Sequence, residues 1–430
     1  MPNYRSEYDS VIRQVKRHEK WFSESLPMIA SENVASKAVR DVMSSDLGQR
    51  YAEGWPGERV YAGCRYIDQI ELTAIELAKK LFRAEFVDVR PTSGVVANLA
   101  VYSALSAPGD VMMALPIPNG GHISAGKKEF SGTAGLVHSL ELEYFAFDKE
   151  EMNIDVDATK KRIRELKRPI KIGMFGGSLF LFPHPVKELA GAVRDAGGTV
   201  CYDAAHVAGL IAGRQFQDPL REGAEVMTFS THKTLYGPQG GAIVASERLS
   251  EDIKKAVFPG TTSNHHLHSV AGKALLFAEF LEFGRRYARD VVVNAQVLGE
   301  ELAALGEKVL GERNGYTKSH QVAVDVTKYA DGGVMEKKLE AQNIIVNRQL
   351  IPGDLQAGRH YTNPGGIRLG VAELTRLGMG KGEMKEVAVI LHEAMATDKK
   401  REIAARVKDL RRGHQKVKYA FGESPAYFFR

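Results

Sequence analysis

The chain has 430 residues, of which 44% are hydrophobic and 26% are charged. This balance is typical of a globular protein with a buried core, and it excludes disordered, collagen-like and small disulfide-rich proteins. The net charge of +5 comes from 58 basic and 53 acidic residues that mostly intermix, so we expect no nucleic-acid partner.

The chain begins with a charged helical pattern. Residues 1–30 contain no apolar run like that of a signal peptide, and no stretch of 18 apolar residues occurs in the sequence, so we expect no membrane partner. Cys64 and Cys201 are too few for a disulfide framework, which favours a cytoplasmic location. Residues 44–68 are rich in Gly, Tyr and Arg without regular periodicity, and we predict a loop there.

The middle of the chain alternates helical patterns with short apolar runs. Helices are predicted over 70–82, from the Ser-Gly turn at 93–94 to 105, and over 185–196. The apolar runs cover 170–175, 199–202, 225–229 and 242–245. This alternation predicts βαβ units and a mostly parallel, doubly wound α/β sheet with both faces covered.

The pattern changes after a long helix that is predicted over 270–304. Beyond it, separated strands such as 321–326 and more highly charged helices indicate a smaller α/β domain. We therefore expect three parts: an N-terminal helical arm with a loop segment (1–70), a large doubly wound domain (71–285) and a small C-terminal domain (286–430).

Residues 399–418 include nine basic and only two acidic residues. Ile403, Val407 and Leu410 recur there at helical spacing, which predicts an amphipathic helix with one apolar stripe. We interpret its basic residues as a solvated helix face.

The segment Ser230-Thr231-His232-Lys233-Thr234 follows a buried-strand pattern and precedes a glycine-bearing turn at 237–241. A lysine that attacks a carbonyl must be desolvated or lie near other cations, so that its amine is neutral. His232 would supply part of that environment for Lys233. Taken alone, a lysine in a loop is more often a solvated surface charge, so its neighbours in the fold decide between the two interpretations.

Asp203 ends the apolar run at 199–202, and His206 follows one turn later. Open α/β sheets bind ligands at the carboxyl ends of their strands. If the ligand were pyridoxal phosphate (PLP), an aspartate there would keep the ring nitrogen protonated, whereas the alternative is a simple helix cap. The Ser93-Gly94 turn opens a helix whose amides and dipole favour a phosphate group, although such turns often only cap a helix.

Two other motifs suggest a nucleotide or metal binder that is not an enzyme. Residues 121–128 match a P-loop except at Lys128, where Ser or Thr is required, so we expect no nucleoside triphosphate site. His265, His266 and His268 cluster before the long helix without a partner cysteine or an HExxH pattern. We expect no metal there, but a helix entry with polar residues.

Five motifs occur together in this order: IASEN (29–33), RYAEG (50–54), DAAHVAG (203–209), STHKT (230–234) and GIRLG (366–370). As a set they resemble the serine hydroxymethyltransferase family over residues 18–395. The resemblance implies a fold-type I PLP enzyme that interconverts L-serine and glycine and transfers a one-carbon unit to a tetrahydropterin. It also implies a homodimer, or a tetramer built from dimers, with shared active sites.

The resemblance also implies roles for residues at matching positions. Lys233 would carry PLP covalently, Asp203 would pair with the ring nitrogen and His122 would stack on the ring. The remaining cofactor contacts would be Ser93, Gly94, Val95, Ser178, His206 and Ser230, with Tyr51 and Gly260 reaching the phosphate of the neighbouring subunit.

The substrate side of the implied site involves fewer residues. Arg368, Ser31 and Tyr61 would hold the amino-acid carboxylate, because a guanidinium can bind a carboxylate through two hydrogen bonds. Glu53 would act as the acid-base group near the serine hydroxyl. The catalytic set would comprise Lys233, Glu53, Tyr51, Tyr61 and His232.

The chain departs from the commoner family pattern at three places, one of which is residues 118–123, which read PNGGHI where a His-Gly-Gly-His-Leu pattern is more usual. Gln239 stands where an arginine is usual, and residues 261–266 read TTSNHH where Gln-Gly-Gly is usual. These departures resemble the archaeal-like branch of the family, some of whose members use a modified pterin. On the same scaffold, an α-methylserine hydroxymethyltransferase and a threonine aldolase or transaldolase are the alternatives.

Overall fold

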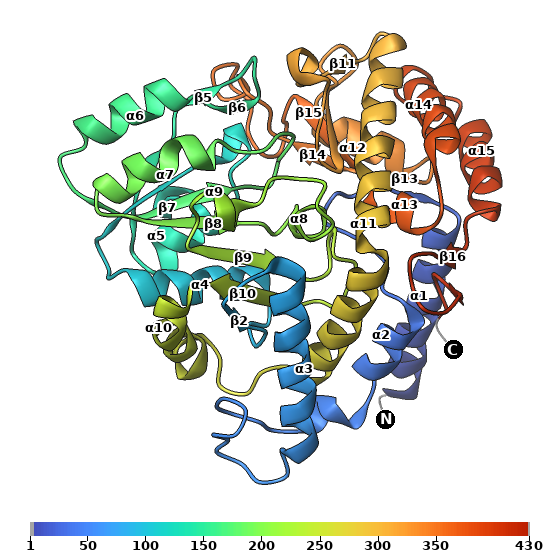
Figure 1. Ribbon diagram of the computed structural model, residues 1–430. Coiled ribbons are helices and arrows are strands. Elements are labelled where there is room, and N and C mark those ends of the chain that lie inside the picture. Colours follow the sequence, from blue (N-terminus) through green and yellow to red (C-terminus); the bar gives the residue numbers. More distant parts are fainter. Residues whose placement is uncertain (1–3, 429–430) are drawn as a thin grey trace.

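Seven strands form the central sheet of the computed structural model, which describes residues 4–428 (Figure 1). Their order is β2-β10-β9-β8-β7-β3-β4, and all neighbours are parallel except β10, which is antiparallel to both β2 and β9. The strands are β2 (Phe86–Asp88), β3 (Val111–Ala114), β4 (Glu141–Tyr144), β7 (Ile170–Gly176), β8 (Thr199–Asp203), β9 (Val226–Ser230) and β10 (Gly241–Ala245). The prediction of a mostly parallel sheet is confirmed, and the four predicted apolar runs coincide with β7 to β10.

Both faces of this sheet are buried, which explains the continuous apolar runs. Along β10, Val244 packs into one hydrophobic cluster, whereas Ile243 and Ala245 pack into another on the opposite face. Helices α4 and α10 contribute to the second cluster, and α3, α7, α8 and α11 contribute to the first. The helices in these layers are α3 (Arg65–Phe82), α4 (Gly94–Leu105), α5 (Thr133–Val137), α6 (Val156–Glu165), α7 (Val186–Asp195), α8 (Ala208–Ala212), α9 (Pro219–Glu222), α10 (Ser250–Lys255) and α11 (Leu267–Ala304).

Helix α3 begins five residues before the predicted position. Arg59 in the preceding loop donates to Asp68 (2.8 Å) and to Glu71 (2.9 Å), so polar contacts hold the first turns of the helix. Apolar periodicity does not detect such contacts. The predicted loop at 44–68 therefore ends where α3 begins, and it also contains the short helix η1 (Asp46–Gln49).

A second, antiparallel sheet lies beside the upper end of α11 in Figure 1. Its strands, in order, are β11 (Lys308–Val309), β12 (Gln321–Asp325), β15 (Gly366–Gly370) and β14 (Asn347–Gln349). Helices α12 (Gly332–Glu340), α13 (Ala372–Arg376) and α14 (Lys381–Ala396) accompany it. The predicted strand at 321–326 and the predicted long helix are confirmed. Because α11 runs continuously along both sheets, the division after residue 285 stays a prediction.

The N- and C-terminal segments lie on the same side of the molecule (Figure 1). Arg376 donates to the carbonyl of Tyr419 (2.6 Å), and Arg40 donates to the carbonyls of Pro425 (2.8 Å) and Ala426 (2.5 Å), which ties down the chain after α15. The elements of these segments and the small pairings are α1 (Tyr4–Ser23), α2 (Lys37–Met43), α15 (Lys400–Arg412), β1 (Leu26–Pro27), β5 (Phe147–Asp148), β6 (Asn153–Ile154), β13 (Ile344–Ile345), β16 (Lys416–Val417) and β17 (Ser424–Pro425).

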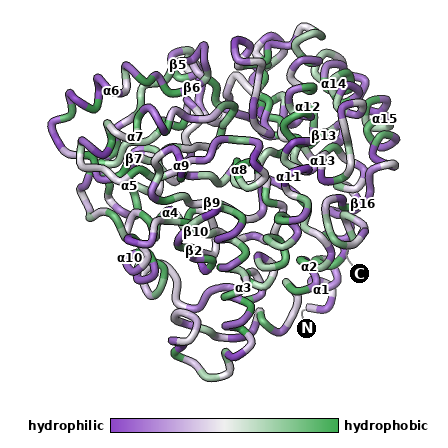
Figure 2. The backbone as a smooth tube through the Cα atoms, viewed as in Figure 1, coloured by the Kyte–Doolittle hydropathy of each residue, from purple (hydrophilic) through white to green (hydrophobic). Residues whose placement is uncertain are grey.

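Helix α15 is the predicted basic amphipathic helix, and Figure 2 shows hydrophilic and hydrophobic residues alternating along it. Ile403 and Val407 are fully buried, which confirms the apolar stripe. Two of its basic residues form ion pairs with neighbouring elements, Arg406 with Glu393 (2.6 Å) and Lys408 with Glu24 (2.9 Å). Between residues 4 and 428, none of the helices combines the length and apolar character that a membrane span needs.

Candidate active site

Polar residues follow three neighbouring strands at one edge of the central sheet. Asp203 is the last residue of β8, and Ser230 is the last residue of its parallel neighbour β9. Ser178 follows β7, which lies on the other side of β8, and Lys233 follows β9. Because the carboxyl ends of adjacent parallel strands meet in space, the fold brings these four residues to one place.

The Lys233 side chain is buried at this edge, with 8% of its surface exposed. Burial lowers the pKa of its amine to about 8; the Asp203 carboxylate opposes this shift, and the Arg368 guanidinium adds to it. Asn33 donates from Nδ2 to the Lys233 carbonyl (2.8 Å) and to the Tyr287 hydroxyl (2.8 Å), which fixes the turn that carries the lysine. A buried amine with such a pKa is suited to attack a carbonyl.

His232 is itself largely shielded from solvent. Burial, followed by the charge of Lys233, lowers the pKa of the imidazole to about 4. Its Nδ1 is buried and has no hydrogen-bond partner within residues 4–428. His232 is therefore neutral near pH 7, and the cation that lowers the pKa of Lys233 is Arg368.

Asp203 is held by a network that the sequence did not reveal. Asn98 from α4 donates to Asp203 Oδ2 (2.8 Å), and the Ala205 amide donates to Oδ1 (2.9 Å). Asn98 Nδ2 also donates to Ser124 Oγ (2.9 Å), which in turn lies 2.7 Å from His122 Nδ1. The network fixes the carboxylate and the imidazole relative to each other, and burial lowers the pKa of His122, so that its ring is neutral.

A cradle for an anion lies at the start of α4. Ser93 Oγ accepts from the Val96 amide (3.2 Å), and the amides of Gly94 and Val95 have no carbonyl in their own helix to donate to. Ser230 lies so close that a Cβ at Gly94 would be 2.5 Å from its Oγ. Glycine keeps this space open, and the amides and the dipole of α4 favour a phosphate group there.

Lys273 on α11 holds the backbone that leads into this cradle. Its fully buried amine donates to the carbonyls of Val89 (2.7 Å), Pro91 (3.1 Å) and Gly241 (2.9 Å). These carbonyls lie on the connection from β2 to α4 and at the start of β10. Sequence reasoning missed Lys273, because a lysine in a helix is usually exposed; its position among apolar neighbours was the available signal.

Arg368 reaches the site from β15, and its guanidinium is buried. Its Nη1 donates to the carbonyl (2.8 Å) and the hydroxyl (2.9 Å) of Ser178, and its Nε donates to Asn347 Oδ1 (3.3 Å). Burial lowers the pKa to about 10, and in the described part of the chain no carboxylate offsets that shift. A buried guanidinium without a counter-ion is suited to bind a ligand carboxylate.

Ser31 lies on a segment that passes between these groups. The Gly370 amide, two residues after Arg368 on β15, donates to the Met28 carbonyl (2.7 Å), and a Cβ at Gly370 would lie 2.4 Å from Ala30 Cα. Two residues further along the chain, Asn33 holds the turn of the lysine, as described above. The segment around Ser31 is therefore fixed between β15 and the lysine turn.

His206 is buried beside the same edge, and burial lowers the pKa of its imidazole well below the ordinary value. Its Nδ1 lies 3.0 Å from Gln321 Nε2, and its ring stacks on that of His320 with centroids 5.6 Å apart. Gln321 is the first residue of β12 in the smaller sheet, and His320 directly precedes it. Neither residue was identified as part of the site from the sequence.

The loop with Tyr51, Glu53 and Tyr61 lies at the bottom of Figure 1. The tyrosines are 55% and 44% exposed with ring centroids 5.3 Å apart, and Glu53 Oε1 accepts from Ser263 Oγ (2.6 Å). Gly260 is exposed on the irregular helical segment η6 (Ala256–Thr261). None of the hydrogen bonds formed within residues 4–428 connects these residues to the strand-end group of the same chain.

The histidine cluster at 265–268 and the P-loop-like segment at 121–128 form different local structures. His265 Nε2 lies 2.8 Å from Glu71 Oε2, which also pairs with Arg59, so this histidine belongs to a buried ion-pair network at the entry to α11. Among the described residues, no three His, Cys, Asp or Glu side chains are placed to hold a metal ion. Residues 121–128 form short turns, including η3 (Ile123–Ala125), instead of a loop that opens a helix.

The strand-end residues together fit PLP. The cradle at Gly94 and Ser230 suits a phosphate, Asp203 presents a carboxylate with unused lone pairs, and Lys233 offers an amine that is easily neutralised. With the sheet order and the buried Arg368, they are suited to an α/β enzyme that brings an amino acid to a carbonyl cofactor.

Comparisons with known proteins identify the family. A protein-family model described as "Serine hydroxymethyltransferase" matches residues 5–391. Proteins of that name from Cenarchaeum symbiosum and Nitrosopumilus maritimus are 62% and 61% identical to the chain, covering 98% and 96% of it and 97% and 95% of their own lengths. One from Methanothermobacter marburgensis is 50% identical over 98% of the chain and 97% of its own length. The chain belongs to the serine hydroxymethyltransferase family of PLP-dependent transferases, and the archaeal-like resemblance is confirmed.

Proposed function

We propose that this chain binds PLP on Lys233 and interconverts L-serine and glycine, with a tetrahydropterin as the one-carbon acceptor. The observation that carries the proposal is the convergence of Lys233, Asp203 and the uncompensated Arg368 at one buried edge. PLP supplies an electron sink for the carbanion that forms at Cα of an amino acid. Asp203 would keep the ring nitrogen protonated, and its fixed hydrogen bonds to Asn98 and Ala205 support this role.

Arg368 would bind and orient the substrate. Two parallel hydrogen bonds from a guanidinium to a carboxylate fix the rotation of the amino acid about Cα, which decides which bond to Cα breaks. Ser178 and Asn347 hold the guanidinium in place, and Ser31 stands on the segment beside β15. The same residues would bind serine, threonine and α-methylserine equally well. The residues around the side chain of the substrate therefore determine which of the three is preferred.

Glu53 would remove the proton from the serine hydroxyl, in the active site of the neighbouring subunit. The support is its placement on an exposed loop together with Tyr51 and Tyr61, away from the strand-end group of its own chain. A carboxylate is a suitable base for a hydroxyl when it is positioned within hydrogen-bond reach. We therefore propose a homodimer, or a tetramer built from dimers, with shared sites.

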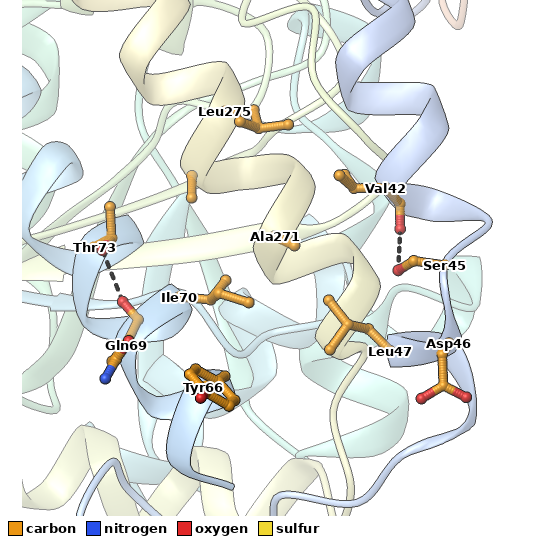
Figure 3. Close-up of a pocket in the computed structure, with 11 residues that line it drawn as sticks. Val42, Ser45, Asp46, Leu47, Tyr66, Gln69, Ile70, Thr73, Ala271 and Leu275 are labelled. Carbon is orange, nitrogen blue, oxygen red and sulfur yellow. Dashed lines mark hydrogen bonds between the residues drawn. The ribbon is translucent and has the colours of Figure 1, made fainter.

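An apolar surface near this loop supports the homodimer. A pocket of about 590 Å³ opens between α2, α3 and α11. Figure 3 shows Leu47, Ile70 and Leu275 facing this hollow from three different elements. Tyr66 in the pocket wall is 68% exposed, and Leu72 on the same helix is 50% exposed. Exposed apolar patches of this kind are typical of subunit interfaces.

Mixing two inactive variants tests the shared site. Lys233→Ala and Glu53→Gln chains are each expected to be nearly inactive. After unfolding and refolding together in equal amounts, half of the dimers would pair the two variants, and each mixed dimer would contain one intact site, so about a quarter of the wild-type activity should return. Activity that stays at the mean of the two separately refolded variants would contradict the sharing of sites.

The reaction itself is tested by measuring glycine released from L-serine by the purified protein. We expect rapid release only with a pterin, and assays with tetrahydrofolate and with tetrahydromethanopterin would identify the acceptor. L-threonine and α-methyl-L-serine serve as matched alternative substrates. Equal rates with and without every pterin would indicate an aldolase or transaldolase, and preference for α-methylserine would indicate the corresponding hydroxymethyltransferase.

The two free, buried cysteines support a cytoplasmic location.

A further inference from the structure

Gln321 connects the smaller sheet to two loops of the large sheet. It is the first residue of β12, and its side chain is fully buried. Its Oε1 accepts from the Phe180 amide (2.8 Å), and its Nε2 donates to the Ser178 carbonyl (3.0 Å) and lies 3.0 Å from His206 Nδ1. Apart from a longer approach of Nε2 to His320 Nε2 (3.5 Å), the contacts of this amide are therefore with residues that follow β7 or β8.

The orientation of the Gln321 amide is fixed by its backbone partners. A backbone N–H can only donate and a carbonyl oxygen can only accept, so Oε1 must face Phe180 and Nε2 must face Ser178. An exchanged amide would leave both backbone groups unsatisfied in a buried place. His320 Nε2 cannot accept the second N–H, because it donates its own hydrogen to the Ala30 carbonyl (3.0 Å). The second N–H of Nε2 is then the donor to His206 Nδ1.

This orientation determines where His206 carries its proton. The imidazole is neutral near pH 7, because burial holds its pKa well below the ordinary value and the nearby charges of Lys233 and Arg368 act in the same direction. His320, which stacks on it, is also neutral, since burial lowers its pKa to about 3. A neutral imidazole that accepts at Nδ1 must carry its hydrogen at Nε2.

Gln321 also shares a partner with the buried arginine. The Ser178 carbonyl accepts from Gln321 Nε2 and from Arg368 Nη1, at 3.0 and 2.8 Å. Two donors from adjacent strands of the smaller sheet, β12 and β15, thus converge on one carbonyl oxygen of the loop that follows β7. A shift of Ser178 would therefore move the guanidinium that the proposed function assigns to the substrate carboxylate.

We propose that Gln321 is a positioning residue that keeps the hydrogen of His206 on Nε2 and holds the Ser178 carbonyl that orients Arg368. The inference rests on the proposed function for its consequences in catalysis, but the tautomer of His206 is a property of this chain alone. If the side chain at the start of β12 only filled space, its amide would need neither a fixed orientation nor its two acceptors, the Ser178 carbonyl and His206 Nδ1.

The tautomer is tested directly in the protein without cofactor. In the 15N spectrum of histidine-labelled wild-type protein, the His206 signals, assigned by their loss in His206→Asn, should show Nε2 protonated and Nδ1 bare. Gln321→Glu presents only acceptors, one of which still serves the Phe180 amide, so the hydrogen should move to Nδ1. A wild-type imidazole with its hydrogen on Nδ1, or a tautomer unchanged in Gln321→Glu, would overturn the proposal whatever the enzyme catalyses.

The consequence for the loaded enzyme is tested with Gln321→Met, which keeps the length of the side chain but makes no hydrogen bonds. We expect a shifted pH dependence of the visible absorption of bound PLP, and a KM for L-serine raised roughly tenfold or more, since buried polar groups lose their partner. The control is Gln342→Met, which replaces another fully buried glutamine, bound to the carbonyls of Lys338 and Ala394.

Both variants should lower the melting temperature to a similar extent, but the control should leave the absorption and the KM unchanged. Equal effects of the two variants on absorption and KM would reduce Gln321 to a packing residue. A failure of the proposed function would appear differently, as a wild-type protein that neither absorbs visible light with PLP nor releases glycine.

Discussion

Replacing Lys233 with alanine is expected to remove the visible absorption of PLP-loaded protein and to lower the release of glycine by a factor on the order of 10⁴ or more. The amine is buried at the carboxyl edge of the sheet, and no other lysine follows β7, β8 or β9 as closely. PLP can still settle on the phosphate cradle of such a variant, but no covalent bond would retain it through dialysis, so the loss of colour after dialysis reports the missing bond to Lys233. Absorption spectra of wild type and variant after dialysis measure it, with the exposed Lys187→Ala as control.

The same lysine gives a pH dependence with a definite sign. Only the neutral amine attacks a carbonyl, and burial with the nearby Arg368 lowers its pKa to about 8. Reloading of cofactor-free protein with PLP should therefore accelerate as the pH rises towards about 8 and level off above it. Colour that survives in Lys233→Ala, or a reloading rate that falls as the pH rises from 6 to 8, would contradict the assignment of Lys233.

The fold was largely predictable because it is built from covered parallel strands. The cores of β7 to β10 are continuous apolar runs, since Val244 and its neighbours are buried on both faces, and such runs stand out from the helical patterns between them. The start of α3 was harder to predict from the sequence. Ion pairs of Arg59 hold the first turns of this helix, and such polar contacts leave no apolar periodicity in the sequence.

The site residues that lie at or just after the end of a strand could be predicted from the sequence. Asp203 and Lys233 lie at the ends of β8 and β9, so their meeting follows from the topology. Asn98 and Gln321 meet the site through contacts across layers and sheets, over sequence separations of 105 and 115 residues. The available signal was a polar residue in an apolar context, Asn98 within a buried helix and Gln321 at the start of a buried strand.

Replacing Arg368 with lysine is expected to raise the KM for L-serine by roughly 100-fold, because one partner of a buried, hydrogen-bonded charge pair loses its geometry. The positive charge remains, so a purely electrostatic role would survive the substitution. A lysine ammonium is a point charge, however, and it cannot bind Ser178 and Asn347 while also presenting two parallel donors to a carboxylate.

The measurement separates substrate binding from the other functions of the site. KM and kcat for L-serine are compared at saturating pterin, and the affinity for PLP and the KM for the pterin serve as internal controls that should change little. Because the carboxylate grip also fixes rotation about Cα, kcat should fall together with the loss of affinity. A serine KM within threefold of the wild-type value would assign the carboxylate to another group, whereas a loss of PLP affinity alone would make Arg368 part of the cofactor site. The expected pattern, weak serine binding with intact cofactor binding, follows from the place of Arg368 on the smaller sheet, opposite the strand ends that surround Lys233.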